Sequence, residues 1–395
     1  MKEFLKTYTI RVTPLSPIHI GCGEDFEPTN YVIDKKKLYT FDPVRLLLSL
    51  GDEARREFSC IVDKNNSLRE IQEFFYKYKE TALRIGVSNA DVVEEAQKFY
   101  DSRIGKITQR EDTVLNKLEI ARTAFNPCNN QPILPGSSVK GAIRTALLDK
   151  CRNDKRYVVK TKEGIRDLPD REIRKEAERQ CQLMIQDRFQ KNEDFFTDPL
   201  RFIKIGDGAS QETIRTRICF QVNRKKHPNN YRAGGNINTL LECISGNMNQ
   251  FFTTQWSIEM KDGNSGQLPK LQFDFSGIAE ACHTFYYDRF KAECAVLEEN
   301  HYADNWVHSI ENHLKLGGKL DELVKKREGF LLRVGRHSGA ESVTVDAPRS
   351  IKIMKGRGQH ASYAEKTTTL WLAADRKNQW DRLKPFGWVF VQIVP

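Results

Sequence analysis

The amino-acid sequence predicts an α+β fold in which large helical insertions interrupt segments of strand. Three observations predict it: residues 7–13 alternate polar and apolar side chains, residues 52–118 are rich in helix formers, and several strand-like segments follow residue 200. Helices and strands alternate without the regular spacing of βαβ units, which argues against a doubly wound sheet. Because 395 residues exceed what one hydrophobic core usually fills, we expect two cores, or one core with insertions.

The elements before residue 118 follow directly from this pattern. A first strand over residues 7–13 ends where Pro14 and Pro17 remove backbone donors. Beyond it, apolar residues recur at helical spacing with charges between them, as at Leu68, Ile71 and Phe75. Residues 52–118 are therefore predicted to form a helical insertion.

A loop and a helix are predicted next. Residues 126–136 contain three prolines and two adjacent asparagines, so they form a loop that brings the chain to Ser137 or Ser138 as a helix N-cap. The helix should run to about Cys151, because a single buried stripe follows at Val139, Ala142, Ile143, Ala146 and Leu147.

The remainder of the chain alternates between charged, helical and strand-like segments. Residues 152–179 are dense in both charges and should be exposed helix and loop, and helices are expected over residues 278–316 and 320–327. Strands are expected over residues 200–205, 213–222, 251–260, 330–334, 342–345, 350–354 and 387–394.

These elements suggest two parts. Residues 1–260 would form a core that carries the helical insertion and a basic β-hairpin excursion, the thumb, over about residues 206–258. Residues 261–395 would form a helical segment followed by C-terminal strands and glycine loops.

The positive charge is concentrated in two blocks. The chain has 63 Lys and Arg against 53 Asp and Glu, a net charge of +10. Residues 151–230 hold 19 basic against 13 acidic residues and residues 329–395 hold 11 against 5, whereas residues 231–328 between them hold 10 against 14. Two basic blocks that flank an acidic one favour a local surface for a polyanion, although solvated surface charge is the alternative.

Several classes of protein are excluded by composition. With 39% hydrophobic and 29% charged residues the chain is neither disordered nor collagen-like. It has no apolar run of the roughly 20 residues that a membrane helix needs, and no secretory signal. The nine cysteines are odd in number and never spaced as CxxC, which argues against a disulfide framework or a zinc site. We therefore expect a cytoplasmic protein without a cofactor or metal.

The first candidate site lies directly after the first strand, over residues 17–23. Gly21 and Gly23 allow tight bends that present backbone amides to an anion. No third glycine follows, so the segment is not a dinucleotide-binding motif. His19 could be a structural hydrogen-bonding residue, an RNA contact or a general base, and these alternatives stay open.

The second candidate site is the glycine-serine segment that enters the predicted helix. Exposed amides at a helix start, together with hydroxyl groups and cations, are suited to phosphate. The segment is not a P-loop, because its lysine precedes the second glycine and no Lys-Ser/Thr pair follows. Its candidate RNA-binding residues are Gly136, Ser137, Ser138, Lys140 and Arg144.

The third candidate site combines two basic glycine loops near the end of the chain. Arginines and lysines set among glycines suit phosphate contacts, although an ordinary pair of glycine turns is the alternative. Its candidate RNA-binding residues are Arg333, Arg336, His337, Ser338, Lys352, Lys355 and Arg357.

The three sites together resemble the RAMP superfamily of CRISPR-associated proteins. Members of that superfamily begin with a strand that ends in a P-x-H-x-G-type turn, here residues 17–23, and carry an L-P-G-S-S-x-K-G-x-I-R-x-A-L segment, here residues 134–147. Within the superfamily, residues 15–21, the chain length and the Arg-Val-Gly-Arg-His-Ser-Gly segment at 333–339 are most similar to the fifth subunit of type III-A (Csm) effector complexes.

The resemblance implies a ferredoxin-like (RRM-like) core with insertions, and it leaves open a second, degenerate ferredoxin-like part. It also implies a noncatalytic subunit that binds crRNA, caps the backbone filament at the crRNA 3′ end, and supports crRNA maturation and antiviral defence. The implied partners are crRNA, target RNA and the neighbouring backbone and small-subunit proteins of a hetero-oligomeric complex, without a membrane.

Two other functions are compatible with the same motifs. One is a RAMP endoribonuclease that processes precursor crRNA with His19 as general base. The other is a RAMP subunit of a type III-B or III-D complex, because the helix segment is shared across the superfamily.

Overall fold

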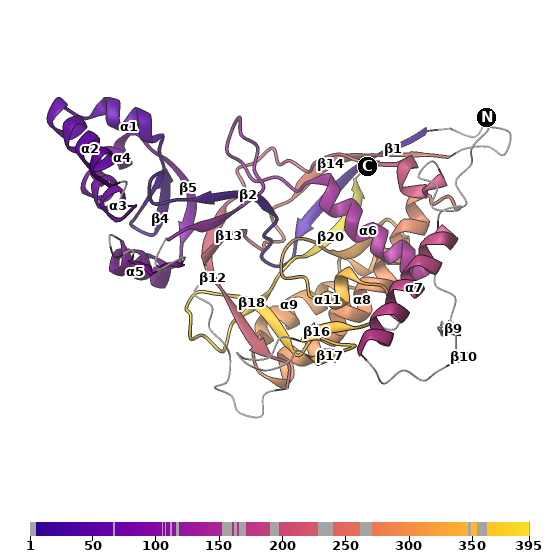
Figure 1. The fold of residues 1–395 in the computed structure, drawn as a ribbon. Helices are drawn as coiled ribbons and strands as arrows, with labels where there is room; N and C mark the ends of the chain where they lie inside the picture. Colours follow the sequence, from indigo (N-terminus) through magenta and orange to yellow (C-terminus); the bar gives the residue numbers. More distant parts are fainter. Residues whose placement is uncertain are drawn as a thin grey trace.

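A five-stranded antiparallel sheet forms one half of the molecule (Figure 1). The computed structural model describes residues 5–394 except 66–67, 105, 107, 111–112, 116–117, 152–159, 162–163, 166–170, 190–196, 228–239, 261–270, 347–348 and 354–361. In spatial order the strands of this sheet are β11 (Ile203–Ile205), β14 (Phe252–Glu259), β1 (Leu5–Pro14), β20 (Trp388–Val394) and β15 (Gly329–Arg333). The strand predicted over residues 7–13 is thus confirmed and lies at the centre of the sheet.

Two long helices pack against this sheet. α8 (Phe275–Glu299) begins with Phe275, whose ring lies 5.3 Å from that of Tyr8 on β1, 6.0 Å from that of Trp256 on β14 and 6.0 Å from that of Phe330 on β15. α6 (Gly136–Lys150) packs against α8 and buries Val139, Ile143, Ala146 and Leu147, as its hydrophobic stripe predicts. The other helices of this half are α7 (Arg171–Phe189), α9 (Asp304–Leu314), α10 (Asp321–Lys325) and α11 (Ala340–Val343).

A nine-stranded mixed sheet joins this half to the rest of the molecule. β12 (Thr216–Lys225) is its longest strand and pairs with β13, β5 and β18. The remaining strands are β2 (Gly21–Phe26), β3 (Tyr31–Asp34), β4 (Lys37–Thr40), β5 (Val87–Val92), β8 (Ile120–Thr123), β13 (Leu240–Ile244), β18 (Thr369–Ala374) and β19 (Lys384–Pro385).

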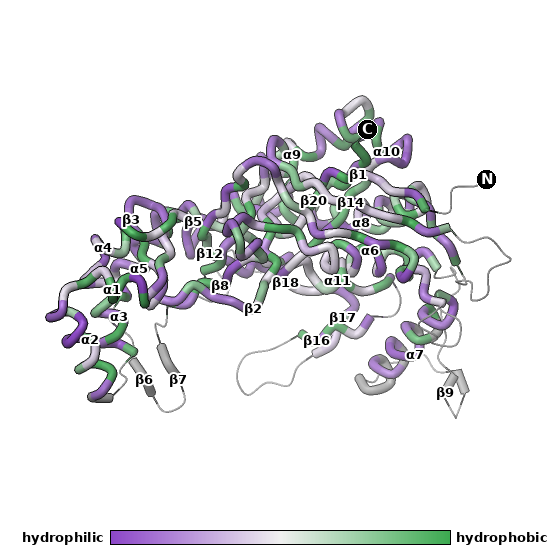
Figure 2. The backbone as a smooth tube through the Cα atoms, turned by 90° about the horizontal axis from the view of Figure 1, so that it is seen from above, coloured by the Kyte–Doolittle hydropathy of each residue, from purple (hydrophilic) through white to green (hydrophobic). Residues whose placement is uncertain are grey.

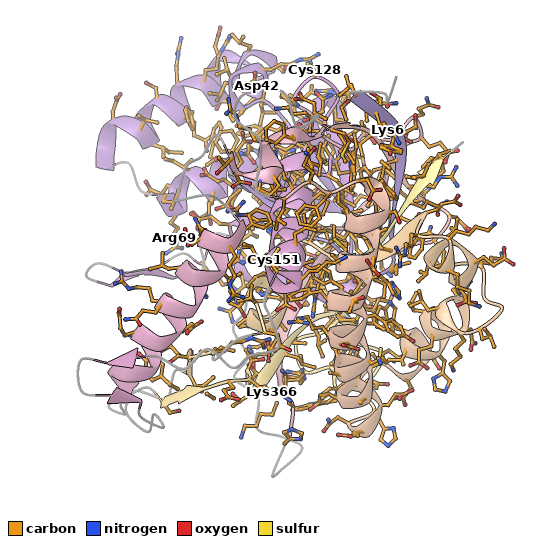
Figure 3. The ribbon with its side chains drawn as sticks, turned by 90° about the vertical axis from the view of Figure 1, so that its right-hand side faces the viewer. Lys6, Asp42, Arg69, Cys128, Cys151 and Lys366 are labelled. Carbon is orange, nitrogen blue, oxygen red and sulfur yellow. The ribbon has the colours of Figure 1, made fainter. Side chains whose placement is uncertain are left out.

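A helical lobe occupies the far end of the second sheet, as Figure 2 shows. It contains α1 (Pro43–Ser49), α2 (Asp52–Asn65), α3 (Leu68–Lys77) and α4 (Lys79–Ile85), with α5 (Glu94–Arg103) beside them. Asp42, labelled in Figure 3, caps α1 by accepting from the backbone of Val44 at 2.8 Å. The lobe has a small core of its own, formed by Val32, Phe41, Leu46, Leu50, Ala54, Phe74, Phe75 and Ala82.

Three short hairpins complete the described structure. They are formed by β6 (Thr108–Arg110) with β7 (Thr113–Leu115), by β9 (Lys160–Thr161) with β10 (Gly164–Ile165), and by β16 (Ile351–Ile353) with β17 (Ser362–Ala364). The hairpin of β16 and β17 projects from the same side of the molecule as α7 (Figure 2). In the residues that the structure describes, no helix is both long enough and apolar enough to cross a bilayer.

The mixed helix and strand composition predicted from the sequence is confirmed, with local corrections. The predicted helical insertion over residues 52–118 includes strand β5, and the helix predicted over residues 278–316 is divided into α8 and α9. Residues 342–345, predicted to be a strand, instead end helix α11 at Val343 and leave it, and Thr344 Oγ1 donates to the carbonyl of Ala340 at 2.7 Å. The segment predicted as a strand over 200–205 begins as a 3₁₀ helix (Pro199–Phe202), because Asp198 caps the backbone of Leu200 at 2.8 Å. The predicted N-caps of α6 lie inside the helix, whose cap position is Pro135.

Candidate nucleic-acid interface

Two of the three candidate sites lie side by side, although some 300 residues separate them in the sequence. The backbone of Arg336 donates to the carbonyl of His19 at 2.8 Å. The backbone of Gly387, which directly precedes β20, donates to the carbonyl of Pro17 at 2.8 Å, and the backbone of Val334 donates to the carbonyl of Gly387 at 2.9 Å. Residues 334–339, called the glycine loop below, are therefore docked on residues 17–21.

This docking requires glycine at two positions. Gly335 has a φ of +81°, and a Cβ at this residue would lie 2.4 Å from the carbonyl oxygen of His19. Gly387 has a φ of +86°, and its Cβ would lie 2.2 Å from the carbonyl oxygen of Val334. A larger residue at either position would combine an unfavourable backbone conformation with a steric clash, so these glycines fix the close approach of the two segments.

His19 lies beneath this junction and has little access to solvent. It is 1% exposed, and its Nδ1 lies 2.7 Å from the carbonyl oxygen of Glu242 on β13. Burial lowers the pKa of His19, and the nearby Arg336 acts in the same direction. Gly21 and Gly23, by contrast, are exposed at the start of β2. The geometry thus offers the glycine backbone, and not the imidazole, to a ligand.

Arg333 and Ser338 are both held inside the protein. The Arg333 guanidinium is 6% exposed and forms an ion pair with Glu293 of α8, in which Nη2 and Oε1 are 3.0 Å apart. It also donates through Nε to the carbonyl of Phe386 at 2.9 Å. Ser338 Oγ donates to the carbonyl of Gly335 at 2.8 Å. These side chains stabilise the glycine loop from within.

The other predicted residues of the third site have different surroundings. The side chain of Arg336 is exposed, as is that of Lys352 on β16. His337 adopts a φ of +68° and is partly buried, with its ring 5.0 Å from that of Trp371 on β18. Burial, followed by the charge of Arg336, lowers the pKa of His337 to about 4. Lys355 and Arg357 lie outside the described residues.

The start of α6 packs closely against the strand that precedes the thumb segment. Asp207 Oδ1 accepts from the backbone of Gly136 at 2.7 Å, so the cap is supplied by a residue 71 positions away. A Cβ on Gly136 would lie 2.3 Å from the carbonyl oxygen of Ile205. Ser137 is exposed and Ser138 is half-buried in the first turn of the helix. This first turn therefore presents one hydroxyl group to solvent.

Lys140 and Arg144 share a face of α6 but differ in their partners. Arg144 Nη1 lies 2.7 Å from Asp198 Oδ2, and its guanidinium lies 5.1 Å from the centre of the Phe189 ring. In the described part of the chain, Lys140 has no carboxylate within ion-pair distance. Burial, followed by the charge of Lys204, lowers the pKa of Lys140. Of these two residues, Lys140 is therefore the one whose positive charge an anionic ligand would compensate.

Lys204 is a candidate that the sequence argument missed. It lies exposed at the middle of β11, and the Ile-Lys-Ile alternation of that strand was the available signal for its exposure. Its proximity to Lys140 depends on the packing of α6 against β11, which the sequence pattern does not reveal.

The chemistry offered by these groups is that of a phosphate-binding surface. Exposed backbone and cations without an ion-pair partner suit contacts with phosphate oxygens, which do not read bases. Within the described ranges, no group of three or more His, Cys, Asp or Glu residues is placed to hold a metal ion.

Comparison with known proteins identifies relatives of this chain. The family model described as the RAMP superfamily matches residues 11–319. The "CRISPR system Cms protein Csm5" of Streptococcus thermophilus is 26% identical over 167 residues, which are 38% of this chain and 40% of that protein. The protein of the same name from Methanocaldococcus jannaschii is 24% identical over 212 residues, 52% of this chain and 44% of that protein. These matches span less than half the length of either relative.

Two solved structures share the fold. A chain of the cryo-EM structure of a Csm-crRNA-target RNA ternary complex in a type III-A CRISPR-Cas system superposes with a TM-score of 0.59 and 16% identity, and the match covers 98% of this chain and 100% of that one. The crystal structure of T. onnurineus Csm5 gives a TM-score of 0.53 and 17% identity, covering 84% and 92%. The similarity to a fifth Csm subunit, predicted from the sequence, is confirmed, and the fold shared with T. onnurineus Csm5 covers 84% of this chain. Since the family model covers well over half of the sequence, the chain belongs to the RAMP superfamily.

Proposed function

We propose that this chain is the crRNA-binding subunit of a type III-A CRISPR (Csm) effector complex that caps the backbone filament at the crRNA 3′ end. The names of its relatives and the complex that contains a chain of the same fold support this proposal. The observation that carries it is the docking of the glycine loop on residues 17–21, which places exposed Arg336 next to His19, two residues before exposed Gly21. In this role the chain supports crRNA maturation and antiviral defence.

The order of elements supports a ferredoxin-like core. β1, α6, β11, β14 and α8 follow one another along the chain, and β20 fills the position beside β1 that a fourth ferredoxin strand would take. β15 is then an addition at the edge of the sheet. The segment between β11 and β14, which contains β12 and β13, is in this proposal the base of the thumb; residues 228–239 of it lie outside the described residues.

The proposed subunit is noncatalytic. A general base must reach the proton that it removes, and His19 is buried with one ring nitrogen directed to Glu242. We propose that the chain contacts crRNA and the target RNA bound to it through phosphates, and that it works within a hetero-oligomer of backbone and small-subunit proteins.

The RNA-binding role is tested by reversing the charges of half-buried Lys140 and exposed Arg336. Lys140→Glu combined with Arg336→Glu removes two proposed phosphate contacts while leaving the Arg144–Asp198 pair intact. We expect at least a tenfold loss of crRNA retention by the purified complex, and a reduction of about two in the slope of log affinity against log salt concentration. Filter binding at several salt concentrations measures both quantities.

A single charge reversal outside both segments controls for a general effect of added negative charge. Lys319→Glu alters an exposed lysine in the turn between α9 and α10, outside both segments. It should leave crRNA retention unchanged. Equal crRNA occupancy in the double variant and in the unmodified complex would refute the assignment of this surface.

Two further measurements separate the proposal from its alternatives. Labelled repeat RNA, incubated with the purified chain with and without EDTA, should remain intact; cleavage that is lost in His19→Ala would instead establish a RAMP endoribonuclease. Mass spectrometry of the proteins that co-purify with the chain identifies its complex, and partners of a type III-B or III-D complex would replace the type III-A assignment.

A further inference from the structure

One face of the five-stranded sheet is accessible to solvent over β11, β14 and β1. Helix α8 covers the opposite face, where Phe275 contacts Tyr8 and Trp256. On β14 the even-numbered residues 252–258 of the covered face are buried, whereas the odd-numbered residues 253–259 are not. We call the accessible side the open face; it consists of the odd-numbered residues 5–11 and 251–259, together with Lys204 of β11.

The centre of the open face is polar. Thr9 lies opposite Gln255, whose Nε2 donates to Thr9 Oγ1 at 3.1 Å. Thr7 lies opposite Ser257, and their hydroxyl oxygens are 3.3 Å apart. Hydroxyl and amide groups on an accessible sheet can form hydrogen bonds with phosphate oxygens, sugars and base edges.

An arginine stacked on an aromatic ring lies at one end of the open face. Arg11 is half-buried opposite Thr253, and its guanidinium carbon lies 4.3 Å from the centre of the Phe251 ring. Phe251 is half-buried as well. Aromatic rings and guanidinium planes are the surfaces on which unpaired RNA bases stack. This end of the open face therefore has the chemistry of a base-stacking site.

Lys204 connects the open face to the start of α6. It lies opposite Ser257 and is exposed. After burial, the charge of Lys204 is the largest cause that lowers the pKa of Lys140. The cationic surface at the start of α6 thus continues onto the open face of the sheet.

The composition of the open face favours RNA over protein as its partner. It carries the cations Arg11 and Lys204, with Lys140 adjoining them, and the acidic residue Glu259 lies at the opposite end from Arg11. The core of a protein–protein interface is usually apolar and depleted of charge. Here hydroxyl and amide groups occupy the centre, and the cations beside them complement a polyanion.

We propose that the open face binds a single-stranded segment of RNA, with a phosphate at Lys204 and a base stacked against Arg11 and Phe251. Lys204 is aligned with Thr7 through Ser257. Thr7 and Arg11 are four positions apart on β1, about 13 Å along the strand, so the two contacts belong to different nucleotides. This inference rests on the proposed function, which supplies the RNA, and it extends the phosphate-binding surface of α6 across the sheet.

The first test measures the affinity of the purified full chain for a single-stranded RNA oligonucleotide at several salt concentrations. Lys204→Glu should weaken binding about tenfold and reduce the slope of log affinity against log salt concentration by about one, because one phosphate contact is lost. Lys6→Glu is the matched control. Lys6 is exposed near the start of β1, but it lies opposite Ile258 on the covered side, so binding should not change.

The stacking contact is tested at Phe251. Phe251→Leu keeps an apolar side chain but removes the ring, and should weaken RNA binding about fivefold without changing the salt slope. Phe251→Tyr retains a ring and should bind like the unmodified chain. A comparable loss of affinity in both variants would show that the ring does not act by stacking.

Photochemical crosslinking identifies what covers the open face in the assembled complex. The purified complex is loaded with crRNA that contains 4-thiouridine and is irradiated, and crosslinked peptides are identified by mass spectrometry. We expect crosslinks to residues 5–14 or 251–259. If a lysine-reactive reagent instead joins Lys204 to another subunit and these RNA crosslinks are missing, a protein covers the face and the proposal is wrong.

The outcomes separate this proposal from the RNA-binding role itself. RNA binding that is lost in the double variant of Lys140 and Arg336, but is unchanged in Lys204→Glu and Phe251→Leu, would sink the open-face proposal and leave the proposed function standing. Failure of both the unmodified chain and its complex to bind any RNA would overturn the two together.

Discussion

At the scale of single residues, Arg333 and Arg336 show how one basic segment serves two purposes. They lie three positions apart, yet Arg333 is 6% exposed and paired with Glu293, whereas Arg336 is exposed. The sequence pattern of arginines among glycines predicted RNA contacts for both. It could not separate them, because the partner that holds Arg333 lies on α8, 40 residues earlier in the chain.

The buried pair makes a prediction about stability. Arg333→Met leaves the Glu293 carboxylate buried without its partner, and we expect a loss of about 3–5 kcal/mol in the free energy of unfolding. Burial already raises the pKa of Glu293 against the opposing effect of Arg333, so the variant should take up a proton there. Urea denaturation measures the change.

The double variant Arg333→Met with Glu293→Leu is the control for this prediction. Replacing both charges with apolar groups removes the unpaired carboxylate, so most of the lost stability should return. A single variant as stable as the unmodified chain would show that the ion pair contributes nothing.

At the scale of elements, helix α6 illustrates what local sequence can and cannot predict. Its existence, its length and its buried stripe were predicted within one or two residues, because fifteen residues of regular periodicity carry a strong signal. The predicted N-cap was wrong. Pro135 takes the cap position, and Asp207, from a distant segment, accepts a hydrogen bond from the first amide of the helix. The short strands β2 to β5, β8, β13, β18 and β19 were not predicted, since their pairing partners are distant in sequence.

The two glycines of α6 should respond in opposite directions to alanine. Gly141→Ala adds a methyl group with no atom within 4 Å, and alanine favours the helix by about 1 kcal/mol over glycine. Gly136→Ala places its methyl group 2.3 Å from the carbonyl oxygen of Ile205, so the helix start must move. Thermal unfolding should show a raised Tm for the first variant and a lowered Tm for the second.

These two variants control for each other, since both make the same chemical change in the same helix. A Tm that rises in both variants would mean that α6 and β11 can shift apart at little energetic cost. In that case Lys140 would not be held rigidly beside Lys204.

At the scale of the whole molecule, buried histidines link stability to pH. Burial lowers the pKa of His337 and of His283 to about 4, below the usual value of 6.5. The unfolded chain therefore binds more protons than the folded chain between these values. The two histidines therefore leave the free energy of unfolding unaffected above pH 6.5 and lower it as the pH drops toward 4.

His337→Asn tests this linkage, because asparagine tolerates the left-handed backbone conformation at this position. The fall in Tm between pH 7 and pH 4.5 should be shallower than in the unmodified chain. His308→Asn, which changes a histidine with a 71% exposed side chain, is the matched control and should leave the profile unchanged. Parallel profiles for the His337 variant and the unmodified chain would contradict the prediction.

The division of the whole chain was harder to predict than its elements. The main hydrophobic core takes residues from Ile10 to Val391, and a second small core lies in the helical lobe. Composition and length indicated more than one core or a core with insertions, but the placement of the lobe on a mixed sheet depends on long-range pairing. The boundary at residue 260 stays a prediction.

The central position of β1 has a consequence for how the protein is made. β1 pairs with β14 and β20, whose residues are synthesised about 250 and 380 positions later. During translation one edge of this early strand can pair once β14 has been synthesised, but the other edge stays unpaired until β20 has left the ribosome. A prematurely terminated chain cannot complete the sheet or dock the glycine loop through Gly387. Only chains translated through β20 would then fold completely. Because of this topology, truncated chains would be unable to join an assembly.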